Sequence, residues 1–123
     1  MIYILDTQIA LWAVYDYERI PKDICNFIED EDNEIYYSLV SAWEVEIKHN
    51  IGKLQMSAKD FIDGCECVGF NPLPIKKKHI LGLSEIPSKD NHKDPFDRLL
   101  ISQAKQEQAK LLTVDEKILS YQL

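Results

Sequence analysis

Residues 2–15 read IYILDTQIALWAVY, and this stretch decides the fold class. Its first four residues are apolar and include β-branched side chains, which is the pattern of a short buried strand. Asp6 and Thr7 follow at once and can cap a helix, and the apolar residues of 9–15 then recur at helical spacing. A strand that leads directly into a helix predicts the central parallel strand of an α/β protein.

The rest of the chain repeats this alternation of strand and helix. Further strands are predicted over residues 34–40, 70–75 and 111–114, and two prolines place the 70–75 segment at an edge of the sheet. Helices are predicted over residues 21–28, 42–51, 57–67, 80–83 and 96–109, and a short closing helix includes Ile118 and Leu119. Loop residues gather at 84–92, which we expect to overhang the functional face. This order predicts an α/β sandwich around a parallel sheet, with its ligand site beyond the carboxyl ends of the strands.

Length and composition fit one domain spanning residues 1–123. The chain has 123 residues, of which 46% are hydrophobic, as is ordinary for a globular protein with a single core. Its apolar runs are far shorter than the roughly 20 residues that span a bilayer, and the first residues lack the pattern of a signal peptide. We therefore expect a cytoplasmic protein. Three cysteines without a C-x-x-C pair argue against a disulfide framework or a zinc site.

The formal net charge of −7 argues against a simple basic nucleic-acid binder, because lysine and arginine normally supply affinity for phosphates. Bound divalent cations would change this, since they reverse the local field and give a phosphate its positive partner. Lysines at 48, 53 and 76–78 are candidates for backbone contacts to nucleic acid. A solvated lysine face is the alternative explanation.

Four carboxylates from distant stretches are predicted to meet at one edge of the sheet. Asp6 and Asp115 follow apolar strands, and the carboxyl ends of parallel strands lie at the same edge. Glu44 and Asp97 are expected in the first turns of helices that begin there. Mg²⁺ and Mn²⁺ prefer oxygen ligands and keep several waters. The set therefore predicts metal-dependent phosphodiester hydrolysis, with all four acids as metal ligands and catalytic groups.

Each acid also has a structural interpretation. Asp6 and Asp115 can be helix caps, and Glu44 can be a solvated helix residue. Asp94 competes with Asp97, but its position before a proline is typical of a cap, so we assign Asp94 to structure and Asp97 to the metal. The common placement of the four acids carries the prediction.

Other polar and aromatic residues are given plainer roles. Arg98 can pair with Asp94 or reach a phosphate, and pairing is preferred. The three histidines lack metal-ligand spacing, so none is proposed as a ligand. The aromatic residues considered as base-stacking platforms are instead assigned to the core or to an interface; they are Trp12, Tyr36, Tyr37 and Trp43.

Four segments resemble the PIN-domain family, specifically the VapC-type toxins of bacterial and archaeal toxin–antitoxin pairs. They occur in the family's order and read ILDTQIALW (residues 4–12), SAWEVEIKHNIGKL (41–54), HKDPFDRLLISQA (92–104) and LLTVDEKI (111–118). The second and third together are quite specific. An isolated L-D-T would mean little.

The resemblance implies a three-layer α/β/α sandwich, Mg²⁺- or Mn²⁺-dependent endoribonuclease activity, inhibition by a cognate antitoxin and a homodimer. The family's acids fall on the same four positions, Asp6, Glu44, Asp97 and Asp115, with Thr7 and Thr113 as nearby hydroxyls. Two departures concern substrate preference more than catalysis: Gln8 stands where many relatives have histidine, and Val114 where a small or polar residue is frequent.

Three other classes compete with this interpretation. A phospho-signalling receiver-like module would want an acid after the mid-chain strand, and residues 72–75 supply none. A phosphatase with an aspartate nucleophile would want an acid at Gln8. A non-catalytic PIN-like binding protein is the third alternative, and the complete set of acids disfavours it.

Overall fold

A four-stranded parallel sheet forms the centre of the protein. The structure is a computed structural model that describes residues 1–87 and 94–121. The strands are β1 (Ile2–Leu5), β2 (Glu34–Ser38), β3 (Asn71–Leu73) and β4 (Lys110–Leu112), and they lie in the order β3-β2-β1-β4. Neighbouring strands are parallel throughout. The predictions of a central first strand and an edge position for the proline-containing strand are confirmed.

Alternate residues of β1 point to opposite faces of the sheet and build two cores. Tyr3 and Leu5 belong to one buried cluster with residues of α1 (Thr7–Tyr15), α2 (Lys22–Glu29) and α4 (Ala58–Val68). Ile4 belongs to the other cluster, with residues of α6 (Pro95–Gln106) and α7 (Glu116–Leu119). Successive side chains of a strand alternate in this way, so a strand covered on both faces reads as a continuous apolar run.

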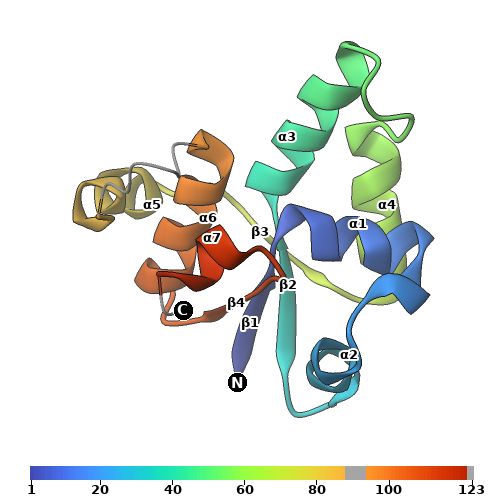
Figure 1. Ribbon diagram of the computed structural model, residues 1–123, viewed down its shortest axis with the longest axis horizontal. Helices are drawn as coiled ribbons and strands as arrows, with labels where there is room; N and C mark the ends of the chain where they lie inside the picture. Colours follow the sequence, from blue (N-terminus) through green and yellow to red (C-terminus); the bar gives the residue numbers. More distant parts are fainter. Residues whose placement is uncertain (88–93, 122–123) are drawn as a thin grey trace.

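Figure 1 shows these two groups of helices on opposite sides of the strands, with the short α5 (Lys77–Leu81) beside α6. The helix α3 (Leu39–Asn50) leaves the end of β2 and contributes Val40 to one core and Val45 to the other. The short 3-10 helices η1 (Tyr17–Arg19) and η2 (Gly82–Glu85) complete the described elements. The three-layer α/β/α sandwich is confirmed.

One glycine permits the close packing of α1 against α4. A Cβ added at Gly64 would lie 2.5 Å from a methyl carbon of Val14, well inside van der Waals contact. Only a residue without a side chain fits at this crossing.

Several predicted boundaries differ from the structure, and two of these differences concern the predicted site. The strand predicted over residues 34–40 ends at Ser38, whose hydroxyl accepts the backbone N–H of Val40 and caps α3. Ser41, which directly precedes the helix predicted over residues 42–51, lies inside α3, so Glu44 lies in the second turn and not in the first. The strand predicted over residues 111–114 ends at Leu112, so two residues separate it from the acid at position 115.

No helix in the described part of the chain is long and apolar enough to cross a membrane. Residues 88–92 of the predicted overhanging loop, which include His92, lie outside the described residues.

Candidate active site

Asp6 follows β1 directly and serves as the N-cap of α1. One carboxylate oxygen accepts the backbone N–H of Ile9 at 2.8 Å, and the other accepts a hydrogen bond from the hydroxyl of Thr113. The side chain is only 4% exposed. The cap interpretation is therefore correct, and it leaves Asp6 at the carboxyl edge of the central strand, where the site was predicted.

The electrostatic surroundings of Asp6 disfavour its negative charge. Burial raises the pKa of this carboxyl to about 6, although the hydrogen bonds from Thr113 and Ile9 act in the opposite direction. The negative charges of Asp97 and Asp115 raise it further. The three carboxylates therefore lie close enough to repel one another. A cation placed among them would favour the ionised form of each carboxylate.

Glu44 is buried against α1 although it lies one turn deeper in α3 than predicted. Its Oε1 accepts a hydrogen bond from Thr7 at 2.8 Å, and its Oε2 pairs with the ammonium of Lys48 at 2.8 Å. The hydroxyl of Thr7 also lies 2.9 Å from that of Ser41. Its burial and its partners rule out the interpretation of Glu44 as a solvated helix residue.

Two acids lie at the start of α6, and the sequence analysis assigned Asp94 to the helix cap and Asp97 to the metal. Asp94 is the N-cap, since its Oδ1 accepts the N–H groups of Phe96 at 2.9 Å and Asp97 at 3.1 Å. Asp97 lies in the first turn, as predicted. The structural role of Asp94 is confirmed, but this residue also lines the site.

Asp115 caps α7 by accepting the N–H of Lys117 at 2.8 Å. Its own N–H donates to the hydroxyl of Thr113 at 3.0 Å. Thr113 therefore bonds both to Asp6 and to the backbone of Asp115, and it links the ends of β1 and β4. The family resemblance indicated this hydroxyl, whereas the strand pattern alone did not.

The four predicted acids line one cleft of about 430 Å³, which we call the carboxylate cleft. Its lining residues are Asp6, Thr7, Gln8, Leu11, Glu44, Lys48, Asp94, Asp97, Val114, Asp115 and Ile118. The sequence reasoning missed Lys48 and Asp94 as lining residues. The Glu44–Lys48 spacing of four residues on a helix was the available signal for the lysine.

The donor set of the cleft is chemically suited to a hard divalent cation. Among the described residues that line it, the side chains able to ligate a metal are five carboxylates, the hydroxyl of Thr7 and the amide of Gln8, with neither histidine nor cysteine. Within residues 1–87 and 94–121, no three His, Cys, Asp or Glu side chains lie close enough to enclose a metal ion unaided. Mg²⁺ commonly binds through one or two carboxylates and keeps several waters, so an open carboxylate cleft fits it better than a closed cage would.

One other assignment is wrong. Arg98 does not pair with Asp94: its guanidinium donates to the carbonyl oxygens of Ile86 at 3.1 Å and Pro87 at 3.2 Å. Trp43 is 50% exposed and lies edge-on against Phe96 of α6, so of its two predicted places, core or interface, the interface stays a prediction.

Lysines 76 and 78 are not a free basic patch, since both pair with Glu107 at 3.3 Å. Lys48 is likewise committed to Glu44.

Solved structures with the same fold belong to toxin–antitoxin complexes. One is VapBC2 from Rickettsia felis bound to a DNA fragment from its promoter: the TM-score is 0.74 at 22% identity, covering 98% of this chain and 93% of the other. VapBC-1 from nontypeable Haemophilus influenzae gives 0.65 at 18%, covering 98% and 92%. A toxin–antitoxin complex from Klebsiella pneumoniae gives 0.62 at 16%, covering 96% and 90%. At these identities the likeness is one of fold.

No curated protein matched the chain. The model of the PIN domain family matches residues 3–122, nearly the whole sequence. The match includes every residue of the carboxylate cleft and all four strands except the first residue of β1. This chain belongs to the PIN domain family.

Proposed function

We propose that this protein is a metal-dependent endoribonuclease and the toxin of a toxin–antitoxin pair of the VapC type. One observation carries the proposal: four carboxylates from four separate elements line a single cleft at the carboxyl edge of the sheet, in a chain that belongs to the PIN domain family. Asp6, Glu44, Asp97 and Asp115 are the proposed metal-binding and catalytic residues, and Mg²⁺ or Mn²⁺ is the proposed ion.

The hydrogen bonds around Asp6 and Glu44 suit these residues to binding a metal ion. Asp6 is held rigidly by two hydrogen bonds, and Glu44 by Thr7 and Lys48, so their oxygens are fixed before any ligand arrives. Such fixed donors need little reorganisation when they bind. When bound, a divalent cation would polarise the scissile phosphoryl group and lower the pKa of the attacking water. Lys48 balances the charge of Glu44 and lies where it can also approach an RNA phosphate.

Four further features belong to the proposal. The neighbouring structures are toxin–antitoxin complexes, which supports a cognate antitoxin as the protein partner. A homodimer, a cytoplasmic location and a single nuclease domain over residues 1–123 remain predictions. Light scattering on the purified chain would decide the homodimer, with a mass of 14.3 kDa for one copy.

The test is cleavage of total RNA and transfer RNA by the purified, antitoxin-free protein with Mg²⁺ or Mn²⁺. We expect cutting that EDTA abolishes and that Asp6→Asn lowers by about 100-fold or more, because the amide keeps the shape but loses the charge that binds the metal. Asp63→Asn is the matched control. It makes the same change at an exposed acid of α4 that pairs with Lys59, and it should leave cleavage unchanged.

Two results would contradict the proposal. Full activity of Asp6→Asn would remove that residue from the site. A folded wild-type protein that binds Mn²⁺ but cuts no RNA would favour a non-catalytic PIN-like binding protein. The receiver-like alternative has no support once the chain is placed in the PIN domain family.

A further inference from the structure

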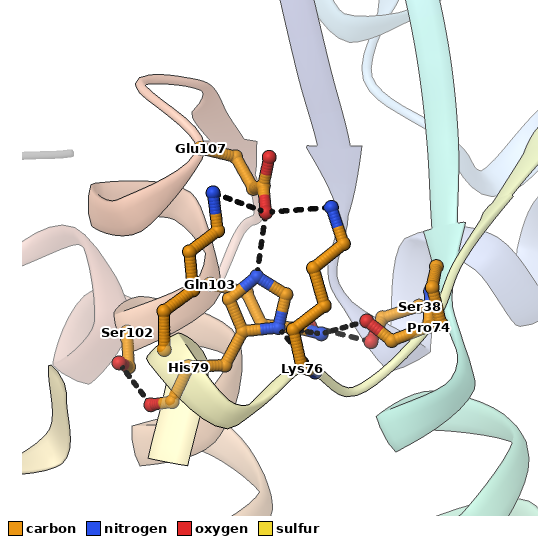
Figure 2. A network of polar contacts seen from close by, with 8 residues as sticks. Ser38, Pro74, Lys76, His79, Ser102, Gln103 and Glu107 are labelled. Carbon is orange, nitrogen blue, oxygen red and sulfur yellow. Dashed lines mark hydrogen bonds and ion pairs between the residues drawn. The ribbon is translucent and has the colours of Figure 1, made fainter. Parts of the chain in front are cut away.

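A second polar cluster lies in the core between α5, α6 and the end of β2, and we call it the buried network (Figure 2). Its side chains and backbone groups come from Ser38, Pro74, Lys76, Lys78, His79, Ser102, Gln103 and Glu107. Four of these residues are completely buried: Ser38, His79, Ser102 and Gln103. Polar groups in a core are costly unless they are bonded, and a fully bonded set fixes one arrangement of the elements around it.

Gln103 of α6 is the centre of the buried network. Its amide oxygen accepts a hydrogen bond from the hydroxyl of Ser38 at 2.5 Å. Its amide nitrogen lies 3.2 Å from Nδ1 of His79 and 3.4 Å from the carbonyl oxygen of Pro74. Figure 2 shows the side chain reaching between these groups. Both ends of the planar amide are engaged, so the side chain has one orientation.

His79 is held from both sides of its ring. Nδ1 accepts the backbone N–H of Lys76 at 3.0 Å, which leaves the ring proton on Nε2, 2.7 Å from the carboxylate of Glu107. Burial disfavours the charge of Glu107, but the hydrogen bonds from His79, Lys76 and Lys78 outweigh it and lower the pKa to about 2. The far end of the buried network is therefore a carboxylate that stays ionised and keeps α5 in place.

The near end of the buried network reaches the helix that carries Glu44. Ser38 is the N-cap of α3, and its hydroxyl both accepts the N–H of Val40 and donates to Gln103. Gln103 lies on α6, which also carries Asp97. The Ser38–Gln103 bond thus joins the two helices that bring Glu44 and Asp97 to the carboxylate cleft.

We propose that Gln103 is a positioning residue that sets the placement of α3 relative to α6 through Ser38, and so tunes the affinity of the carboxylate cleft for a divalent cation. The inference rests on the proposed function. An apolar side chain of similar size would fill the same space, but its contacts are not directional and permit small shifts and rotations of the helices. A bonded amide permits only one relative placement.

The test compares Gln103→Met with Ser102→Ala. Methionine keeps the length of the side chain and removes its hydrogen bonds. Ser102 is the neighbouring residue, equally buried, and its hydroxyl donates to the carbonyl oxygen of His79 at 2.6 Å. Its loss removes a buried hydrogen bond between α6 and α5 but leaves the link to α3 intact. Ser102→Ala is therefore the matched control for a purely structural loss.

The measurement is Mn²⁺ binding by isothermal titration calorimetry without RNA, at a temperature where thermal unfolding shows each variant to be folded. We expect Gln103→Met to weaken Mn²⁺ binding by about tenfold, the lower end of the effect of removing residues that support metal ligands. Ser102→Ala should bind Mn²⁺ as the wild type does. Equal affinities of Gln103→Met and the wild type, or equal losses in both variants, would overturn the proposal.

A second pair of variants tests the Ser38–Gln103 hydrogen bond from the side of α3 and serves if Gln103→Met does not fold. Ser38→Ala removes both the cap of α3 and the bond to Gln103, whereas Ser57→Ala removes only the cap of α4, where the hydroxyl accepts the N–H of Asp60 at 3.2 Å. Weaker Mn²⁺ binding in Ser38→Ala alone supports the proposal, and equal binding in the two variants overturns it. Binding and cleavage by the wild type decide the proposed function separately.

Discussion

Asp6 and Glu107 are both acids held by hydrogen bonds, yet their surroundings treat their charges in opposite ways. Within the described residues, Asp6 has no cation among its hydrogen-bond partners, and burial together with the charges of two neighbouring acids raises its pKa to about 6. Burial also disfavours ionised Glu107, but a histidine and two lysines overcome it and lower its pKa to about 2. A matched charge stabilises the fold. An unmatched one at the end of a central strand costs stability and is typical of a functional site, which supports the proposed binding of a cation there.

The largest expected effect is a difference in RNA cleavage between variants of the two acids at the start of α6. Asp97→Asn should lower kcat by about 100-fold or more, because a ligand charge is lost. Asp94→Asn should cost far less activity and little stability, since asparagine caps a helix as well as aspartate does. RNA cleavage and thermal unfolding of both variants give the comparison. Equal losses of activity would show that Asp94 acts in the cleft and is more than a cap.

The opposite effects of the two charges should appear in the free energies of unfolding of Glu107→Gln and Asp6→Asn, measured in metal-free buffer. Glu107→Gln should lower the free energy of unfolding by about 1–2 kcal/mol at neutral pH, because His79, Lys76 and Lys78 lose their ionised partner. Asp6→Asn should not lower it to a similar extent, since it removes an unfavourable buried charge. Denaturant titrations of the two variants measure both values.

The pH dependence of Glu107→Gln has a definite sign. The pKa of Glu107 is lower in the folded protein, about 2, than its ordinary value of 4.5. The stability from its charge is therefore present above about 4.5 and is lost as the pH falls towards 2. The difference between wild type and Glu107→Gln should shrink over this range. A difference that stays constant down to the lowest pH at which both proteins fold would contradict the assignment.

The smallest expected effect concerns the cation that Asp6 is proposed to bind. Mn²⁺ at about three times its dissociation constant should raise the free energy of unfolding of the wild type by about 0.8 kcal/mol. The same concentration should not stabilise Asp6→Asn. Thermal unfolding with and without EDTA, at constant ionic strength, measures this. Equal stabilisation of both proteins would place the bound ion away from Asp6.

The carboxylate cleft could be predicted because its acids are marked by local sequence. Asp6 ends an apolar run, Asp115 closely follows another, and Asp97 comes just after a proline that begins a helix; strand ends and helix starts of a parallel sheet share one edge. The exact boundaries could not be predicted. Ser38 and Ser41 are both suitable caps. Ser38 caps α3 because the pairing of β2 with β3 ends at Ser38, opposite Leu73.

The buried network could not be predicted at all. Gln103 lies within the helix predicted over residues 96–109 and on its buried face. Its partners at positions 38 and 79 are 65 and 24 residues away, and no sequence spacing relates them. His79 was not proposed as a metal ligand because it lacks ligand spacing, and that reasoning gives no information about its tautomer or its bond to Glu107.

The sequence by itself determined which segments become strands and helices and which edge gathers the carboxylates, because apolar periodicity and helix starts are local signals. Only the tertiary structure decided how the charge of each acid is balanced, since that depends on neighbours from distant segments and on burial. Lys48 partly neutralises Glu44, Glu107 is fully matched, and Asp6 is left among other acids. Electrostatic energy falls with distance and rises as water is excluded, and both are fixed only when the chain has folded.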